Sequence, residues 1–448
     1  MLKLYTFALL VFTQSIFAQI PKPALVGYWQ NWSTDLPLNS IDNNYNVIQL
    51  AFATTVGSSL SNMEFTLPSN YTKTSFLADI DILHSKGKVI ILSIGGANDP
   101  VRLDDTNAKN EFVTTINKIL SDYNYKIDGI DLDLESTSMN FGSTWTMTSM
   151  STAQLNLVTA VNEIMASYKK QINKKLLLTM APETIYLMGA LSDYQINNLN
   201  GGAMLPIIQA LGSQLDLLHC QYYNAGGASG GTFAIDNVVY HDNFNPNYIT
   251  SMTESIIKGF TLLNNKGIYT GIPASKIALG LPSERCVSAG TGYNTPANVC
   301  LASKYLQGKI SKPSGWSYTV TQSYADLAGL MCWSINNDQH NCDETYGFAK
   351  NFSCAFPAVI TGVEYLASEY NSKMIMFPNP TKGELHINVS GFNSNYQLEI
   401  TDMNGQVILK TELAEGRNDL TEFKVSTGIY SAKLKAGNEY IVQKLVVN

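Results

Sequence analysis

The sequence predicts an α/β fold: a (β/α)8 TIM barrel followed by a small all-β sandwich domain. Eight short β-rich runs recur between residues 25 and 336, separated by polar or glycine-bearing loops and helix-length stretches. Carboxylates, amides, tryptophans and tyrosines gather at the carboxyl ends of these runs, where barrels of this class carry their sites. After about residue 366, apolar and polar residues alternate and Asn-Gly and Gly-Asn turns occur, which is typical of a small sandwich.

The predicted barrel strands are regularly spaced along the chain. They span residues 25–32, 47–53, 88–96, 129–135, 175–183, 215–224, 276–284 and 329–336. Eight strands with helix-length connections fit a barrel better than an open doubly wound sheet. The segment that begins at residue 93 has its two glycines at 95 and 96 and lacks the GxGxxG spacing, which disfavours a dinucleotide-binding sheet. We therefore assign the barrel to residues 19–365, a linker to 366–373 and the sandwich to 374–448.

Residues 1–18 have the layout of a secretory signal peptide. Lys3 precedes a short apolar run, and a small residue, Ala18, closes that run before a more polar segment. The run is too short for a membrane anchor, and no later run reaches spanning length. We therefore expect a secreted, extracellular protein without a membrane span.

The charge balance excludes several classes of partner. The chain has 29 Lys and Arg against 36 Asp and Glu, and its basic residues form no cluster. Binding to phosphates or anionic lipids relies on such a cluster. We therefore expect no nucleic-acid partner and no binding to a membrane surface. Separately, we expect the protein to be a monomer.

The six cysteines are expected to include two local disulfides. Cys286 and Cys300 bracket a Gly/Ser/Asn/Pro-rich loop, and Cys342 and Cys354 bracket a short segment. In an exported protein each pair is a plausible bridge. The other two cysteines, at 220 and 332, lie in strand-like runs and are expected to be buried free thiols. No Cys/His spacing suggests zinc, so we expect no metal and no cofactor.

The run at 129–135 places acidic residues inside a predicted strand. Because residues two apart share a face, Asp131, Asp133 and Glu135 point one way and the intervening apolar residues point the other. Asp128 breaks this parity, so we assign it a structural role. On a barrel strand the acids would line the interior, with Glu135 at the mouth.

Such a row of carboxylates points to acid catalysis. Like charges at this spacing cannot all ionise cheaply, so a proton should be shared along the row and Glu135 should act as an acid near neutral pH. Cleavage of an acetal needs a proton for the leaving oxygen and negative charge beside the developing cation. The duller alternatives are a calcium site or a salt-bridged core. Calcium is disfavoured because the strand spreads the three carboxylates over about 13 Å.

The segment "DGIDLDLE", residues 128–135, matches the DxxDxDxE signature of glycoside hydrolase family 18, which contains chitinases and endo-β-N-acetylglucosaminidases. Further segments resemble motifs of this family in the right order: "SIGG" at 93–96, "MAPE" at 180–183, "QYYN" at 221–224 and "GLMCWSIN" at 329–336. The resemblance covers nearly all of residues 24–355 and is strongest to bacterial chitinases of the D type.

The resemblance implies roles for five residues in a substrate-assisted reaction, in which the 2-acetamido oxygen of the substrate is the nucleophile. Glu135 would be the general acid and then the base, Asp133 would orient the acetamido group, and Asp131 would tune the charge of Asp133. Tyr223 would donate a hydrogen bond to the acetamido carbonyl. Trp333 would form the floor beneath the sugar.

Further substrate contacts are expected at the mouth of the barrel. They are Tyr28, Gly96, Met180, Glu183, Gln221 and Asn224. Asn224 stands where many family members have Asp, a departure that the D type shares. Trp32 and Trp145 would form either outer subsites or surface packing. The connection 285–328 is too short for the extra α+β insertion of some relatives, which predicts a shallow, open cleft.

The resemblance leaves the substrate open. Chitin or chito-oligosaccharides are favoured by the D-type pattern, whereas the chitobiose core of N-glycans offers the same acetamido group. A non-catalytic chitin-binding lectin of the same fold would typically lack the last Glu of the signature, and this chain keeps Glu135.

The C-terminal module resembles the sorting domain of the type 9 secretion system. The resemblance covers about residues 374–448 and rests on "FPNPTKG" at 377–383, "DMNGQ" at 402–406, "GIY" at 428–430 and "QKLVV" at 443–447. It implies passage through the outer membrane by the type 9 machinery, with later release or attachment at the cell surface. The module has no tryptophan, unlike most modules that bind insoluble polysaccharide, and a fibronectin-like spacer remains the alternative.

Overall fold

The computed structural model divides the chain into two compact units, residues 1–357 and 358–448. It describes residues 19–142, 144–224, 232–233, 239–240, 245–286, 291–357, 373–377, 379, 381, 383–390, 396–402, 405–420, 425–436 and 439–447. The expected signal peptide and nearly all of the expected linker lie outside the described residues. No helix in the described part of the chain combines the length and apolar character needed to cross a membrane.

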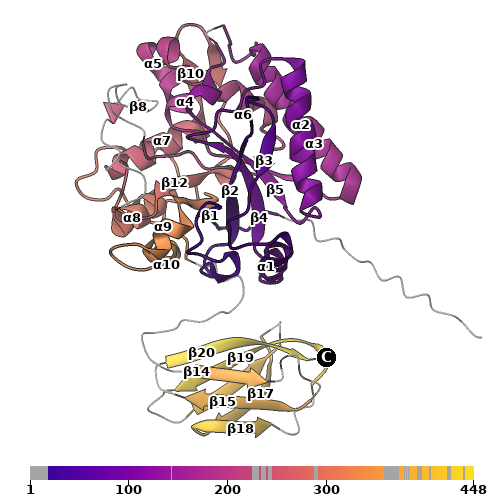
Figure 1. Cartoon of the computed structure of the whole chain (residues 1–448). Helices are drawn as coiled ribbons and strands as arrows, with labels where there is room; N and C mark the ends of the chain where they lie inside the picture. Colours follow the sequence, from indigo (N-terminus) through magenta and orange to yellow (C-terminus); the bar gives the residue numbers. More distant parts are fainter. Residues whose placement is uncertain are drawn as a thin grey trace, which may run out of the picture. The chain divides into compact units, whose positions relative to one another are not determined.

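The first unit is a (β/α)8 barrel, which confirms the predicted fold class (Figure 1). Its parallel strands are β1 (Ala24–Gln30), β2 (Val47–Thr55), β4 (Val89–Gly96), β5 (Gly129–Leu134), β6 (Leu177–Met180), β7 (Leu217–Leu218), β12 (Ala278–Pro282) and β13 (Gly329–Trp333). They pair in the order β12-β13-β1-β2-β4-β5-β6-β7. Parallel bridges from Leu218 to Ile277 and from Gln221 to Gly280 connect the two ends of this order. Each strand coincides with one of the predicted runs, although β1 begins one residue before its run and β2 ends two residues after its run.

Helices surround the strands on the outside of the barrel (Figure 1). They are α1 (Lys73–Ser85), α2 (Thr106–Asp122), α3 (Thr152–Ile172), α4 (Ile185–Met188), α5 (Asp193–Asn198), α6 (Leu205–Leu211), α7 (Pro246–Lys258), α8 (Pro296–Leu306), α9 (Ile335–Gln339) and α10 (Gly347–Ala355). The longer ones begin at residues that accept hydrogen bonds from the first turn. For α3, Ser151 and Gln154 form a capping box, and Asn173 ends the helix in the left-handed conformation.

Short elements fill the connections. They are β3 (Met63–Phe65), which pairs with β2, the pairs β8 (Thr232–Phe233) with β9 (Val239–Tyr240) and β10 (Phe260–Leu262) with β11 (Gly267–Tyr269), and the 3-10 turns η1 (Leu38–Ser40), η2 (Ser136–Met139), η3 (Gly189–Leu191) and η4 (Ala274–Lys276). Turn η2 follows the acidic strand directly, so its geometry bears on the site.

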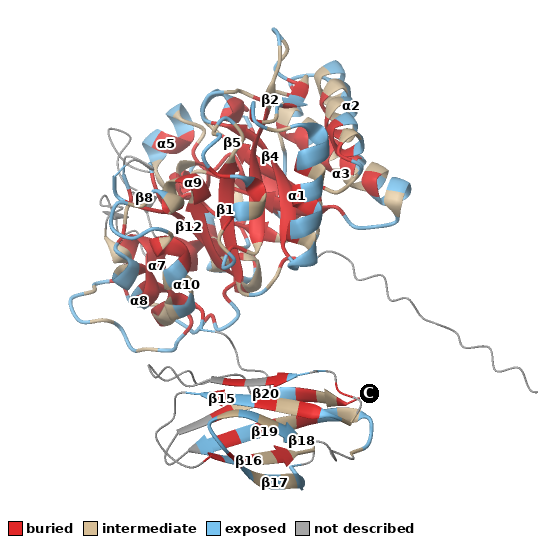
Figure 2. Ribbon diagram, turned by 60° about the horizontal axis from the view of Figure 1, so that its bottom comes forward, coloured by how far each residue is buried: buried red, intermediate tan, exposed pale blue. Residues whose placement is uncertain are grey.

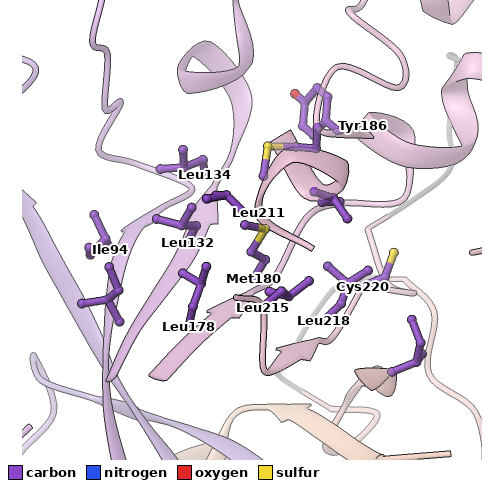
Figure 3. Close-up of a cluster of buried hydrophobic side chains, with 14 of the residues drawn as sticks. Ile94, Leu132, Leu134, Leu178, Met180, Tyr186, Leu211, Leu215, Leu218 and Cys220 are labelled. Carbon is purple, nitrogen blue, oxygen red and sulfur yellow. The ribbon is translucent and has the colours of Figure 1, made fainter. Parts of the chain in front are cut away.

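Strand parity divides the barrel into an outer apolar layer and an interior that combines its own apolar cluster with the polar residues of the site. Leu132 and Leu134 of β5, together with Met180 of β6, belong to the apolar layer between strands and helices (Figure 3). The barrel strands are almost wholly buried, whereas the outer faces of the helices are exposed (Figure 2). Residues of opposite parity on the same strands therefore face the barrel axis.

Asp128 lies just before β5 and has the structural role that its parity predicts. One carboxylate oxygen lies 2.8 Å from Nε2 of His84 and accepts a hydrogen bond from the backbone N–H of Ile90 at 2.9 Å. These contacts join the start of β5 to β4 and α1, away from the carboxyl ends of the strands.

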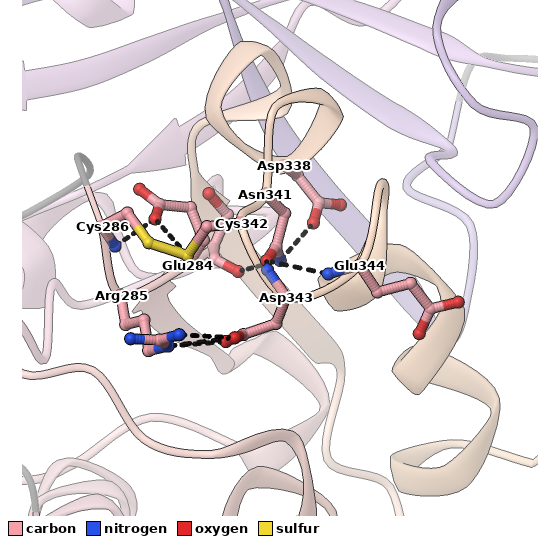
Figure 4. The surroundings of a disulfide bond; sticks show 9 residues. Glu284, Arg285, Cys286, Asp338, Asn341, Cys342, Asp343 and Glu344 are labelled. Carbon is pink, nitrogen blue, oxygen red and sulfur yellow. Dashed lines mark hydrogen bonds and ion pairs between the residues drawn. A yellow bond between two sulfur atoms is a disulfide. The ribbon is translucent and has the colours of Figure 1, made fainter.

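Two disulfides join neighbouring βα connections, and the expected local pairing is wrong. Cys286 pairs with Cys342 across a separation of 56 residues (Figure 4). Cys300 pairs with Cys354 across a separation of 54 residues. The segment after β12 lies beside the segment after β13 because these strands are adjacent, so the cysteines of different loops meet. Glu284 lies beside the first bridge, but oxidised sulfurs are not the thiolates that bind metals. Cys220 and Cys332 are buried free thiols, as expected.

The second unit is an all-β domain, as predicted. One sheet contains β14 (Lys373–Phe377), β15 (Leu385–Ser390) and β18 (Gly416–Leu420), and the other contains β16 (Tyr396–Thr401), β17 (Val407–Leu413), β19 (Gly428–Ala436) and β20 (Glu439–Val447). Both sheets are antiparallel, and their alternate residues form a separate apolar core. This unit therefore has the core of an independent domain.

Candidate active site

The acidic row on β5 points into the barrel, as its alternation predicts. Asp131 is fully buried, Asp133 is almost fully buried, and Glu135 is half-buried at the end of the strand. In the parallel register, Asp131 lies opposite Ser93 of β4 and Thr179 of β6. The row thus rises from the polar interior toward the carboxyl ends of the strands.

Asp131 is held by three hydroxyl groups. Its Oδ2 accepts hydrogen bonds from the hydroxyls of Tyr28 at 2.9 Å and Ser93 at 2.7 Å, and its Oδ1 accepts one from Thr179 at 2.6 Å. Both carboxylate oxygens are thus occupied by hydroxyl donors from three other strands, which fixes the position of Asp131 at the base of the row.

A polar group lies beneath Asp131, made of His219 and Gln49, which belong to none of the sequence motifs. Nε2 of His219 is 3.4 Å from Oδ1 of Asp131 and 3.4 Å from Nε2 of Gln49, which donates to Thr179 at 3.0 Å. Burial lowers the pKa of His219, with Asp131 acting in the opposite direction. Inward strand parity was the only sequence signal that could have identified these residues.

Asp133 and Glu135 are hydrogen-bonded to each other. Burial raises the pKa of Asp133 well above its usual value, and the charges of Glu135 and Asp131 raise it further. Burial also raises the pKa of Glu135, partly opposed by hydrogen bonds from Gln221 and Asp133. Nε2 of Gln221 lies 2.8 Å from Oδ1 of Asp133 and 3.2 Å from Oε1 of Glu135. Burial and the closeness of the two carboxyls thus favour one proton held by the pair.

A cavity of 420 Å³ opens above the acidic row, at the carboxyl ends of the strands. Its lining includes the expected residues Gly96, Glu135, Gln221, Tyr223, Asn224 and Trp333, together with Asn31, Trp32, Phe52, Thr54, Gly95, Ala97, Asn98 and Asp99. Backbone at Gly96 is in the left-handed region, and a Cβ there would lie 2.8 Å from the ring of Phe52. Glycine is therefore required for this wall of the cavity.

Three aromatic rings form a continuous shelf along the cavity. Phe52 stacks on Trp333 with ring centroids 5.7 Å apart and on Trp32 with centroids 6.0 Å apart. Trp32 is 58% exposed, so its face is accessible beyond the acidic row. We define Trp333, Phe52 and Trp32 as the aromatic shelf. Phe52 was not identified from sequence because a phenylalanine in a strand is usually a core residue.

Tyr223 is one of the residues that line the cavity. It is almost fully buried, and burial raises the pKa of its phenol well above the usual value, as do the charges of Asp133 and Glu135. The phenol therefore stays protonated. Asn224 lies next to it, exposed and on the cavity wall.

Two expected substrate contacts are placed elsewhere. Met180 pairs in register with Leu132 and is fully buried in the outer layer, because its parity on β6 is opposite to that of Thr179 (Figure 3). The ring of Tyr28 is buried, and its hydroxyl is bound to Asp131 beneath the cavity. Met180 is therefore a packing residue, and Tyr28 acts on Asp131. Trp145 is also buried, with the Lys266 ammonium 4.1 Å from its ring centroid.

Glu183 lies beside Glu135 and does not line the cavity. Burial raises the pKa of Glu183 to about 7, and the charge of Glu135 contributes to the rise. The carboxyl of Glu183 accepts a hydrogen bond from the backbone N–H of Ser136. Its expected direct contact with substrate stays a prediction.

Another, larger cavity of 1010 Å³ lies at the amino ends of the strands. It is lined by lysines and a few other residues, and its one carboxylate, Asp216, pairs with Lys175 at 2.5 Å. Such a lining offers no general acid for acetal cleavage. The chemistry therefore belongs to the opposite end of the barrel.

Comparison with known proteins matches both units. Residues 24–325 match Glycosyl hydrolases family 18, and residues 375–448 match the Secretion system C-terminal sorting domain. The chain is 35% identical over 327 residues to Chitinase Chi52 of Paenibacillus xylanexedens, covering 70% of the chain and 58% of that protein. It is 34% identical over 328 residues to Chitinase D of Niallia circulans, covering 70% of the chain and 59% of that protein.

Solved structures show the same similarity for the barrel. A family GH18 chitinase from Chromobacterium violaceum aligns with a TM-score of 0.63 and 31% identity, covering 75% of this chain and 84% of that one. By contrast, the chain spans less than two thirds of the length of the two curated relatives.

Proposed function

The chain belongs to glycosyl hydrolases family 18, and on this premise we propose that it hydrolyses β-1,4 bonds between N-acetylglucosamine units of chitin or chito-oligosaccharides with retention of configuration. The observation that carries the proposal is the hydrogen-bonded pair of Asp133 and Glu135 at the base of an aromatic-lined cavity. The names of the two chitinase relatives favour this substrate.

In the first step, Glu135 protonates the glycosidic oxygen as the bond from that oxygen to C1 breaks. The carbonyl oxygen of the substrate's own 2-acetamido group attacks C1 and forms an oxazolinium ion. Asp133 accepts the acetamido N–H, and its negative charge stabilises the cation. This step requires that Glu135 holds the proton of the pair. The proton can pass from Asp133 to Glu135 along the hydrogen bond between them.

In the second step, water attacks C1 and opens the oxazolinium ring. Glu135, now ionised, takes the proton of that water and is restored as the acid. The phenol of Tyr223 donates to the acetamido oxygen throughout, and the indole of Trp333 supports the apolar face of the sugar. The charge of Asp131 below favours a proton on Asp133 or Glu135 between turnovers.

Product analysis tests the proposal. The protein and its Glu135→Gln variant are incubated with a chito-oligosaccharide and with a high-mannose glycopeptide, and the products are identified by mass spectrometry and by the anomeric signals in early NMR spectra. Cleavage of the oligosaccharide to the β-anomer, lost in the variant, is expected. Cleavage of the glycopeptide alone would instead indicate an endo-β-N-acetylglucosaminidase, and binding without cleavage would indicate a lectin.

Residues 374–448 direct export through the outer membrane by the type 9 secretion machinery, after a signal peptide at residues 1–18 has directed the chain across the inner membrane. The match of residues 375–448 to a secretion sorting domain supports this role. Deleting residues 374–448 should retain the protein in the cell. Normal secretion of the truncated chain would make the module a spacer.

A further inference from the structure

The segment that carries Tyr223 leaves the barrel sheet shortly before this residue. In the described part of the chain, its parallel bridges end at Gln221, which pairs with Gly280. The backbone N–H of Tyr222 still donates to the carbonyl of Gly280 at 2.9 Å. Asn224 then has φ of 51°, in the left-handed region, so the chain changes direction directly after Tyr223. Strand pairing alone therefore does not fix the position of Tyr223.

The loop after β12 packs directly against the backbone of Tyr223. A Cβ placed on Gly292 would lie 2.6 Å from Cα of Tyr223, 2.9 Å from its Cβ and 2.7 Å from the carbonyl oxygen of Tyr222. The carbonyl of Thr291 accepts a hydrogen bond from the backbone N–H of Asn224 at 3.4 Å. Only a glycine leaves room for so close an approach of two chain segments.

Two disulfides flank this contact and fix the loop that makes it. Cys286 lies before Gly292 and is joined to Cys342 (Figure 4). Cys300 lies after Gly292 and is joined to Cys354. Both partners belong to the part of the chain that follows β13, so the loop is tied on each side to a neighbouring βα connection. The loop is therefore a firm support for the chain segment that it contacts.

We propose that Gly292 is a positioning residue for Tyr223. By letting the loop reach the backbone of Tyr223, it sets where the phenol lies in the wall of the cavity. The inference rests on the proposed function, because the placement of the phenol matters to catalysis only if Tyr223 donates a hydrogen bond to the acetamido group. Displacement of such a group by about 1 Å can lower the rate about hundredfold.

Two glycine-to-alanine variants separate the contact from the strain of the backbone. Gly292 has φ of 93° and Gly315 has φ of 82°, so an alanine is strained at both positions. A Cβ on Gly315 would have nothing within 4 Å, whereas a Cβ on Gly292 would push against the backbone of Tyr223. Gly292→Ala should therefore lower kcat on a chito-oligosaccharide about tenfold to hundredfold, and the control Gly315→Ala should leave kcat unchanged.

A double-mutant cycle tests whether the loss of activity passes through the phenol. Tyr223→Phe removes the hydroxyl, so Gly292→Ala should lower kcat much less in that background than in the wild type. If Gly292→Ala does not fold, Asn294→Ala takes its place in the cycle. It removes the amide that donates to the carbonyl of Gly292 at 3.4 Å, and it should lower kcat about twofold to tenfold in the wild type and less in Tyr223→Phe.

A spectroscopic measurement tests the contact without relying on activity. Protein labelled with 3-fluorotyrosine gives a ¹⁹F resonance for Tyr223, which is identified by its absence in Tyr223→Phe. This resonance should move in Gly292→Ala, or in Asn294→Ala, and should keep its position in Gly315→Ala. A resonance that keeps its position in all three variants would overturn the inference.

The outcomes distinguish the inference from the proposed function. If the wild type cleaves no chito-oligosaccharide, the proposed function fails and the catalytic role of Gly292 fails with it, although a moved ¹⁹F resonance would still establish the contact with Tyr223. If the wild type is active, the inference alone is overturned by wild-type kcat in the loop variant. It is also overturned by equal fold-losses of kcat in the wild-type and Tyr223→Phe backgrounds, since the loop would then act on catalysis by another route.

Discussion

The hydroxyl of Tyr28 lies 2.9 Å from Oδ2 of Asp131, inside the barrel and beneath the cavity. The bond joins β1 to β5 across the barrel, so it ties the charge of the acidic row to a strand that does not neighbour it. Burial raises the pKa of this phenol well above its usual value, and the charges of Asp131 and Asp133 raise it further. Tyr28 is therefore a fixed donor that helps to position Asp131.

Tyr28→Phe should lower kcat about tenfold or more, since a hydrogen bond to a buried charge contributes about 1.5–3 kcal/mol. The expected loss is in kcat because the Tyr28 hydroxyl does not reach the cavity, and KM should change little. Steady-state kinetics on a soluble chito-oligosaccharide would measure both. Tyr45→Phe is the matched control, since Tyr45 is a buried phenol that donates to Asp338 at 2.7 Å, outside the acidic row. Equal kinetics of both variants would contradict this role of Tyr28.

Glu183 should make the free energy of unfolding depend on pH. Its pKa is about 7 in the folded chain against an ordinary value of 4.5, so the folded state holds this proton more tightly than the unfolded state. Stability from this group is complete below pH 4.5 and is lost as the pH rises through about 7. The loss by pH 8 should be about 3 kcal/mol.

Guanidinium unfolding at pH 5 and pH 8 would measure this loss in the wild type and in Glu183→Gln. All five tryptophans lie between residues 29 and 333, so their fluorescence reports on the barrel alone. The wild type should lose more stability than the variant between the two pH values, since other carboxyls contribute equally to both. An identical change in the two proteins would contradict the raised pKa of Glu183.

The fold and the acidic row could be predicted because both depend on local periodicity. The two-residue period of β5 alone places Asp131 and Asp133 inside the barrel and Leu132 outside it. The same rule applied to β6 would have placed Met180 in the outer layer, because Thr179 pairs with Asp131. The predicted contact of Met180 with substrate is therefore wrong, because adjacent residues of a strand motif lie on opposite faces of the strand.

Other features could not be predicted because they depend on which loops become neighbours. The disulfides join two βα connections, and their pairing follows from the adjacency of β12 and β13 in the closed barrel. His219 approaches Asp131, and Gln49 contacts His219 and Thr179, from strands far apart in sequence. A buried histidine in an apolar run gives no sequence signal for such an approach.

The exposed end of the aromatic shelf should extend the substrate site. Trp32→Ala should lower kcat/KM for a hexasaccharide by about tenfold, because stacking on an indole contributes about 1 kcal/mol beyond the area it buries. A disaccharide or trisaccharide substrate that does not reach the shelf end should be affected less. Comparing kcat/KM across chain lengths measures the effect. Tyr194→Ala is a suitable control, since Tyr194 is 57% exposed on α5, similar to the 58% of Trp32. A loss independent of chain length would contradict an outer subsite.

The two disulfides should stabilise the barrel by shortening the same part of the unfolded chain. Each closes more than fifty residues, for which the chain-entropy account gives at most about 4 kcal/mol. Because the closed loops overlap, removing Cys286 and Cys342 should destabilise more when Cys300 and Cys354 are already replaced by alanine, since the second bridge then no longer shortens the same part of the unfolded chain. Guanidinium midpoints of the two double variants and the quadruple variant measure this coupling. Peptide mapping without reduction checks the pairing: fragments joining 286 to 300 and 342 to 354 would contradict it, and strictly additive losses would show that the overlap has no effect.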